Sequence, residues 1–170
     1  MAVELGEIRT ERLILRRFGD ADLPSIVRIQ SDPATHPHDQ WPATPEHARA
    51  LITLWDRHWL EHGFGYVAVV EARSGGIVGV GGVQTKDLEG EEVLNLYYRF
   101  HPDSWGKGYA PEMAGAVVGW AERALPRLPV VIVTNVGNVP AQRVARKLGF
   151  TQYKEDDYEG VPAKYYRNRL

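Results

Sequence analysis

The sequence predicts an α+β fold in which a mostly antiparallel sheet is covered by helices. Short runs rich in β-branched and aromatic residues recur along the chain, and turns containing glycine join several of them, as is typical of antiparallel hairpins. Other segments space their apolar residues at three and four, which is the pattern of an amphipathic helix. A strand and two helices come first, a hairpin and a central strand follow, a helix, a strand and a helix come next, and a second hairpin closes the chain.

The first part of the chain is predicted to form one strand followed by two helices. Leu13 to Phe18 is predicted as a short strand, and Asp20 as the N-cap of the helix that follows it. Residues 32–42 then form a proline-rich loop. Thr44 is expected to cap a second helix, with Pro45 at its first position.

The second half contains most of the predicted sheet. A helix is expected at 111–123, because apolar residues recur there at spacings of three and four. A last helix is expected between the strand that ends at Thr134 and the closing hairpin. The predicted strands are Tyr66 to Ala72, Ile77 to Gln84, Glu92 to Phe100, Val130 to Thr134, Thr151 to Tyr158 and Val161 to Arg167.

Composition narrows the class of protein. The 170 residues suit a single domain, 1–170, and 44% apolar content is enough for an ordinary core. A net charge of −2 argues against broad attraction to nucleic acid or to a membrane surface, and no apolar run approaches the ~18–20 residues of a membrane span. Cysteine is absent, which excludes thiolate nucleophiles. Without a signal-peptide core at the N-terminus, we expect a cytoplasmic protein.

Residues 101–112 join the apolar run 93–100 to the helical pattern that follows. Glycines let backbone amides approach a ligand closely, and a helix N-terminus presents unpaired N–H groups with a partial positive charge, so we expect phosphate oxygens to bind here. The stretch is not a P-loop, because Gly108 stands where Ser or Thr would hold magnesium. It is not a dinucleotide fingerprint either, because Pro111 replaces the last glycine.

This stretch resembles the pyrophosphate loop of the GNAT acetyltransferase superfamily, Gln/Arg-x-x-Gly-x-Gly/Ala. Residues 105–110 read Trp-Gly-Lys-Gly-Tyr-Ala, a form typical of the branch that includes the ribosomal-protein alanine N-acetyltransferases. Residues 10–16, Thr-Glu-Arg-Leu-Ile-Leu-Arg, look like the opening strand of that branch. Residues 131–135 resemble its fifth strand, and 138–150 resemble its helix ending in Lys-Leu-Gly-Phe.

The resemblance implies the GNAT fold, a twisted and mostly antiparallel mixed sheet of about seven strands with helices on both faces. It also implies an enzyme that transfers acetyl from acetyl-CoA directly to an amine. In this family the central strand and the next, parallel strand separate where pantetheine lies. The residues expected to bind CoA are Tyr98, Arg99, Phe100, Trp105, Gly106, Lys107, Gly108, Tyr109, Ala110, Asn138 and Arg143.

Some of these residues have simpler interpretations. Asn138 fits a plain N-cap for the last helix. Lys107 and Arg143 fit solvated surface cations, since charged side chains are common on surfaces.

The catalytic groups depart from the family's pattern. Ala141 stands where the branch usually has Ser, Ala145 where other members carry a tyrosine acid, and Asn95 where the branch often has Glu. Three residues remain candidates for carrying the proton: Tyr97, Tyr98 and His101.

Without an evident base, an acceptor of low pKa is the easier substrate. Deprotonating an α-amine of pKa ~8 at pH 7 costs about 1.4 kcal/mol, against roughly 4.6 kcal/mol for a lysine side chain at ~10.4. A thiol of pKa ~8.5 leaves as thiolate fairly well unaided. The predicted acceptor is a protein N-terminal α-amine or a small-molecule amine.

In the family, the loop between the first two helices helps to form the acceptor site, which places His36, His38 and Trp41 near the amine. The same loop can be an ordinary connection stiffened by proline. The histidines lack the carboxylate–histidine cluster of a metal site, so no metal is expected. A monomer and a homodimer are both compatible with the sequence.

Two other functions stay open. The loss of the usual catalytic residues at 95, 141 and 145 fits a CoA- or acyl-CoA-binding module with weak catalysis. Arginines near the acyl group could instead pair with an acid, which fits an acyltransferase that uses another donor such as succinyl-CoA.

Overall fold

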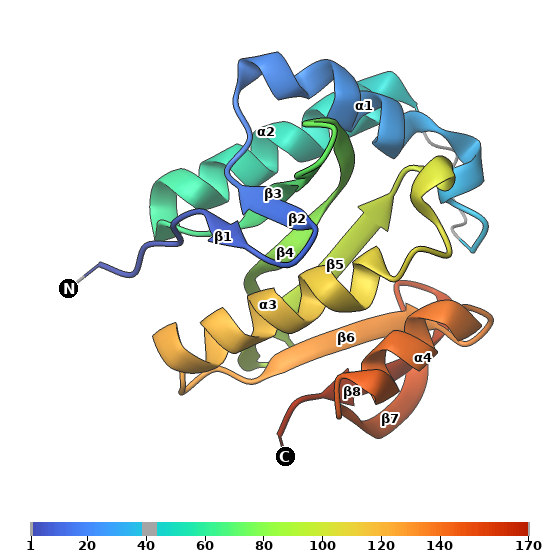
Figure 1. The fold of residues 1–170 in the computed structure, drawn as a ribbon. Helices are drawn as coiled ribbons and strands as arrows, with labels where there is room; N and C mark the ends of the chain where they lie inside the picture. Colours follow the sequence, from blue (N-terminus) through green and yellow to red (C-terminus); the bar gives the residue numbers. More distant parts are fainter. Residues whose placement is uncertain (1, 39–43, 170) are drawn as a thin grey trace.

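The computed structural model describes residues 2–38 and 44–169, which fold around one sheet (Figure 1). Its eight strands lie in the order β1-β2-β3-β4-β5-β6-β8-β7. Their bounds are β1 Ile8–Arg9, β2 Leu13–Arg16, β3 Tyr66–Glu71, β4 Ile77–Leu88, β5 Glu91–Phe100, β6 Val130–Asn135, β7 Thr151–Tyr158 and β8 Val161–Arg167. Neighbouring strands run antiparallel except β5 and β6, which are parallel. The predicted mixed, mostly antiparallel sheet is confirmed.

Helices cover both faces of this sheet (Figure 1). They are α1 Leu23–Ser31, α2 Pro45–His62, α3 Tyr109–Ala124 and α4 Val139–Lys147. Successive side chains of β3 point to opposite faces of the sheet. Val67 and Val69 pack in the core under α3, and Tyr66, Ala68 and Val70 pack in the core under α1 and α2.

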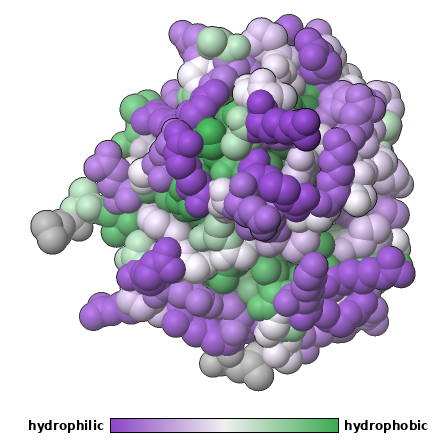
Figure 2. Space-filling model, viewed as in Figure 1, coloured by the Kyte–Doolittle hydropathy of each residue, from purple (hydrophilic) through white to green (hydrophobic). Residues whose placement is uncertain are grey.

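The face of the molecule in this view is predominantly hydrophilic, and most of its hydrophobic side chains lie between polar ones (Figure 2). This fits strands and helices that direct their apolar residues into two buried clusters. Among the described helices, none combines the length and the apolar character needed to cross a membrane.

The starts of the first two long helices show where local prediction succeeds and fails. Thr44 caps α2 as expected, since its Oγ1 accepts the N–H of His47 at 3.1 Å. Asp20 as the N-cap of α1 is wrong, because a short 3₁₀ turn precedes that helix. Asp22 ends this turn, and its carboxylate binds the guanidinium of Arg16 at 2.7 Å.

Candidate active site

The site begins where β5 and β6 separate. The two strands pair only at Leu94 with Val130 and at Asn95 with Val131, although β5 continues to Phe100 and β6 to Asn135. Beyond these pairs, the facing edges of both strands no longer bond to each other. The separation expected from the family resemblance is therefore present.

Backbone groups of β5 open into this gap. In an antiparallel pair, alternate residues direct both their N–H and C=O to the same neighbouring strand. The N–H of Leu94 donates to Pro129 O at 2.9 Å on the β6 side, and the N–H of His101 donates to Val78 O at 2.8 Å on the β4 side. Even-numbered residues of β5 therefore face β6, so Tyr98 directs an amide N–H and a carbonyl into the gap.

A cleft of about 590 Å³ lies between the separated ends of β5 and β6 and extends to the start of α3. Its walls are the end of β5, the loop before α3, the end of β6, the start of α4 and residues from the 35–38 turn. The sequence-predicted residues that line it are His38, Tyr97, Tyr98, Arg99, Phe100, Trp105, Gly106, Gly108, Tyr109, Ala110 and Asn138.

The loop before α3 supplies unpaired amides. Gly106 and Gly108 have φ of +76° and +80°, in the left-handed region that favours glycine. Gly108 is the N-cap of α3, and no side chain caps the helix there. Within the described chain, no N–H group of residues 106–110 donates to another backbone carbonyl or side chain. This end of the cleft can therefore bind an anion.

Trp105 closes part of the open strand edge. Its indole Nε1–H donates to the carbonyl oxygen of Phe100 at 3.0 Å, while 51% of the residue stays exposed. Because that carbonyl is satisfied, Phe100 offers only its N–H to the gap, whereas Tyr98 directs both of its backbone groups there.

Asn138 is the N-cap of α4, as one of its two sequence interpretations predicts, and the other, binding of the pantetheine arm, stays a prediction. Its Oδ1 accepts the N–H of Ala141 at 3.2 Å and caps α4. The side chain also lines the cleft. Because the cap uses only the oxygen, the Nδ2 group remains able to donate to a ligand.

On the face covered by α1, a polar chain runs across the cleft wall. The hydroxyl of Tyr97 donates to Gln30 Oε1 at 3.0 Å and accepts from Arg99 Nε at 2.8 Å. Arg99 also donates to the carbonyl of Thr35. Gln30 and Thr35 carry no motif, so sequence reasoning could not find them.

Tyr98 lies on the opposite face, against the core under α3. Burial raises the pKa of its hydroxyl to about 12. The phenol therefore stays protonated at neutral pH and can act as a proton donor but not as a base.

Asn95 does not replace the missing carboxylate. Its Nδ2 donates to the hydroxyl of Tyr66 at 2.9 Å. Burial raises the pKa of Tyr66, which keeps this hydroxyl neutral as well. Asn95 and Tyr66 therefore form a hydrogen bond between two neutral side chains of the sheet.

Other predicted residues lie away from the cleft lining. His36 Nε2 bonds the carbonyl of Gln30 at 2.7 Å, and His101 Nδ1 accepts the N–H of Asp103 at 3.2 Å. The side chains of Lys107 and Arg143 are not part of the lining either.

Trp41 lies outside the described residues. Among residues 2–38 and 44–169, no group of three or more His, Cys, Asp or Glu is arranged to hold a metal ion.

Comparison with known proteins agrees with this geometry. The family model for the acetyltransferase (GNAT) domain matches residues 12–151. The Bacillus subtilis protein YkkB is 27% identical over 163 residues, which cover 94% of each chain.

Solved structures share the fold. A GnaT-family acetyltransferase structure from Bordetella pertussis superposes with a TM-score of 0.83 at 20% identity, covering 97% of this chain and 100% of that one. The structure of RimL, a ribosomal L7/L12 α-N-protein acetyltransferase in complex with coenzyme A, gives a TM-score of 0.76 at 16% identity and covers 95% and 96% of the two chains. The protein belongs to the GNAT acetyltransferase family.

Proposed function

We propose that the protein transfers the acetyl group of acetyl-CoA to a primary amine, either a protein N-terminal α-amine or the amine of a small molecule. One observation carries the proposal: the β5–β6 pairing stops after two residue pairs, beside a loop whose amides are unpaired. An open strand edge and an anion-binding helix start are the two features that a pantetheine arm and a diphosphate require.

The residues present fit CoA group by group. The N–H groups of residues 106–110 would hold the diphosphate, and the backbone N–H and C=O of Tyr98 would pair with the amides of the pantetheine arm. The Nδ2 of Asn138 is available to the same arm. A CoA held in this way would place its thioester near the point where β5 and β6 separate, where Tyr97 and Tyr98 line the cleft.

The reaction then needs two proton transfers. The amine nitrogen attacks the thioester carbonyl carbon and loses a proton, while the carbon–sulfur bond breaks and the sulfur gains one. Tyr98 is the better candidate donor to the sulfur, because it lines the cleft and a phenol is protonated at neutral pH. The proton of Tyr97 is already directed to Gln30.

His38 is a better candidate than His36 or His101 to accept the proton that the amine loses. It carries the only imidazole among the described lining residues, and imidazole is the usual general base at neutral pH. His36 and His101 do not line the cleft. Among amine acceptors, an α-amine is the easiest for such a base to deprotonate, because its pKa is lower than that of a lysine side chain. RimL, whose structure shares this fold, is named as an α-N-protein acetyltransferase.

Calorimetric titration with acetyl-CoA, succinyl-CoA and ATP tests the cofactor. We expect micromolar binding of acetyl-CoA, about −8 kcal/mol, and none of ATP. Release of CoA thiol is then measured across N-terminal peptides and small amines. The assay has no background from the protein, which contains no cysteine. No binding to any CoA would contradict the proposal.

A second candidate is a CoA-binding module with weak catalysis. It is favoured by Ala141, which offers no hydroxyl in the cleft lining, and by Asn95, which is bonded to Tyr66. Turnover that Gly108→Val abolishes would exclude this candidate. A higher rate with succinyl-CoA than with acetyl-CoA would assign another acyl donor.

A further inference from the structure

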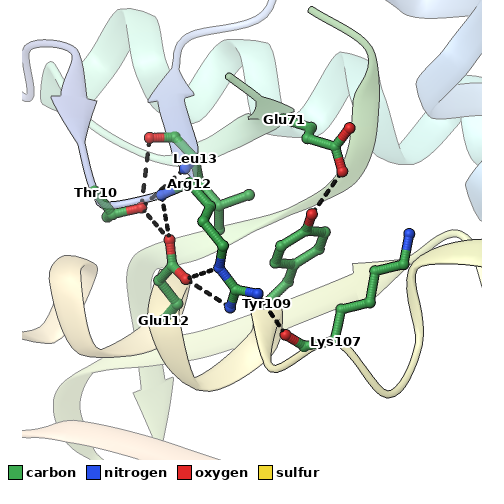
Figure 3. Close-up of polar contacts among 7 residues, drawn as sticks. All are labelled: Thr10, Arg12, Leu13, Glu71, Lys107, Tyr109 and Glu112. Atoms are coloured by element: carbon green, nitrogen blue, oxygen red, sulfur yellow. Dashed lines mark hydrogen bonds and ion pairs between the residues drawn. The ribbon is translucent and has the colours of Figure 1, made fainter. Parts of the chain in front are cut away.

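Arg12, just before β2, reaches the glycine loop 95 residues later (Figure 3). Its Nη1 donates to the carbonyl oxygen of Lys107 at 2.7 Å. Its Nε and Nη2 both lie 2.7 Å from Glu112 Oε1, so one planar guanidinium joins the loop to the first turn of α3.

Glu112 is surrounded by donors from the same segment (Figure 3). Its Oε2 accepts from Thr10 Oγ1 at 2.6 Å and from the backbone N–H of Arg12 at 2.9 Å. Burial alone would raise the pKa of the Glu112 carboxyl, but these donors and the guanidinium outweigh it and hold the pKa below its usual range. The carboxylate is therefore ionised at neutral pH.

Tyr109, the first residue of α3, contacts two side chains from the first part of the chain, Arg12 and Glu71. The guanidinium carbon of Arg12 lies 4.6 Å from the centre of its ring. Its hydroxyl donates to Glu71 Oε2 at 2.5 Å, at the end of β3 (Figure 3). The start of α3 is thus fixed to the segment just before β2 and to the end of β3.

Contact with the Lys107 carbonyl also sets the direction of a neighbouring amide. A trans peptide is planar, so its C=O and N–H point in opposite directions. Because the carbonyl of Lys107 points to Arg12, the N–H of Gly108 points away from Arg12, and Gly108 lines the cleft.

Charge adds a second effect. An acid in the first turn of a helix suits the helix dipole but repels an anion bound at the same N-terminus. Arg12 cancels the charge of Glu112 at the place where a diphosphate would approach the loop.

From these contacts we propose that Arg12 is a positioning residue for the diphosphate site. It orients the Gly108 amide toward the cleft and neutralises Glu112. This inference rests on the proposed use of a CoA thioester, and it gives a role to the Thr-Glu-Arg segment that the sequence resemblance left as part of a strand.

The test compares Arg12→Met with Arg9→Met. Both remove one cation near the N-terminus, but Arg9 pairs with the exposed Glu7 at 3.1 Å and, among the described residues, makes no hydrogen bond or ion pair with the loop. Loss of a charge-assisted hydrogen bond should raise the CoA dissociation constant of Arg12→Met roughly tenfold or more, and leave that of Arg9→Met unchanged. With turnover, KM for acetyl-CoA should rise while kcat stays near that of the wild type.

A shortened donor separates positioning from a general loss of structure. S-acetylpantetheine has no diphosphate, so its KM should be equal in the wild type and in Arg12→Met. Arg12→Met/Glu112→Gln should regain part of the CoA affinity, because the uncompensated carboxylate is gone. If Arg12→Met does not fold, Arg12→Lys serves instead: it keeps the charge but cannot bond both partners through one planar fork, so intermediate affinity is expected.

Loop order is measured without ligand, by the heteronuclear NOE of ¹⁵N-glycine-labelled protein. The Gly108 value should fall in Arg12→Met and not in Arg9→Met. A wild type that fails to bind CoA would refute the proposed function, and the NOE would still decide whether Arg12 orders the loop. A wild type that binds CoA no better than a folded Arg12→Met would refute the inference alone.

Discussion

Gly106→Ala and Gly75→Ala impose the same backbone strain at two places, and only the first should weaken CoA binding. Their φ values are +76° and +75°, and a Cβ at either position would meet no heavy atom within 4 Å. Neither substitution creates a clash, so the comparison isolates backbone conformation.

The loss of stability should be nearly equal. A side chain in the left-handed region costs about 1–2 kcal/mol. The reduced entropy of the unfolded chain offsets about 0.4–1 kcal/mol of this. We expect each variant to lose about 1 kcal/mol of unfolding free energy, which is roughly 2–4 °C in Tm for a chain of this length.

The loss of affinity should differ. A methyl group at Gly106 either occupies cleft space beside the loop amides or forces φ to change, and both outcomes weaken the contact between these amides and a bound diphosphate. One lost hydrogen bond to a charged phosphate costs about 1.5–3 kcal/mol, or roughly 10- to 100-fold in Kd. Gly75 lies in the turn between β3 and β4, outside the cleft lining, so its variant should bind CoA like the wild type.

Urea denaturation measures the first quantity and calorimetric titration with CoA the second. Equal CoA affinity in the two variants, with equal loss of stability, would refute the assignment of the loop amides to the diphosphate.

Three further predictions use other parts of the structure. Asn138→Asp should keep the α4 cap and the unfolding free energy but weaken CoA binding, since the carboxylate cannot donate; unchanged affinity by calorimetry would contradict this. Tyr98→Phe should lower kcat about tenfold or more with little change in KM, because the proton donor is lost; an unchanged kcat would exclude that role. The Arg16 guanidinium, opposed by burial, holds the pKa of Asp22 below its usual range, so its stabilisation is present above the unfolded pKa and is lost as pH falls below about 4. Asp22→Asn should flatten this acid loss in urea denaturation, and an equally steep loss would contradict the assignment.

Features encoded by a few adjacent residues were predictable. Thr44 and Pro45 mark the start of α2, and the cap is present. The bounds of β7 and β8 match the predicted hairpin, because Glu159 and Gly160 form a two-residue turn with positive φ. The loop at 106–110 was predicted in the same way, since glycine spacing before a helix is itself the signal.

Features that depend on distant partners were not predictable. Asp20 is a good cap by sequence, but a 3₁₀ turn ending at Asp22 precedes α1, and the carboxylate of Asp22 binds Arg16 and the N–H of Gly19. Arg12 looks like one more charge beside a strand until the fold brings it to Glu112, 100 residues away. β1 was missed because it has only two residues and exists through its pairing with β2.

The two features that we propose to bind CoA, the unpaired loop amides and the open edge of β5, follow from one parallel connection. Parallel neighbours need a crossover, and the chain between β5 and β6 supplies it through the glycine loop and α3. The crossover starts at the carboxyl end of β5, so the unpaired amides of α3 lie beside that end. Beyond Val131, β6 stays paired with β8 and leaves β5, which opens the backbone of Tyr98 in the same place. The candidate anion site and the open strand edge thus lie side by side. A substitution that extended the β5–β6 pairing should abolish the proposed CoA binding without altering the glycine loop.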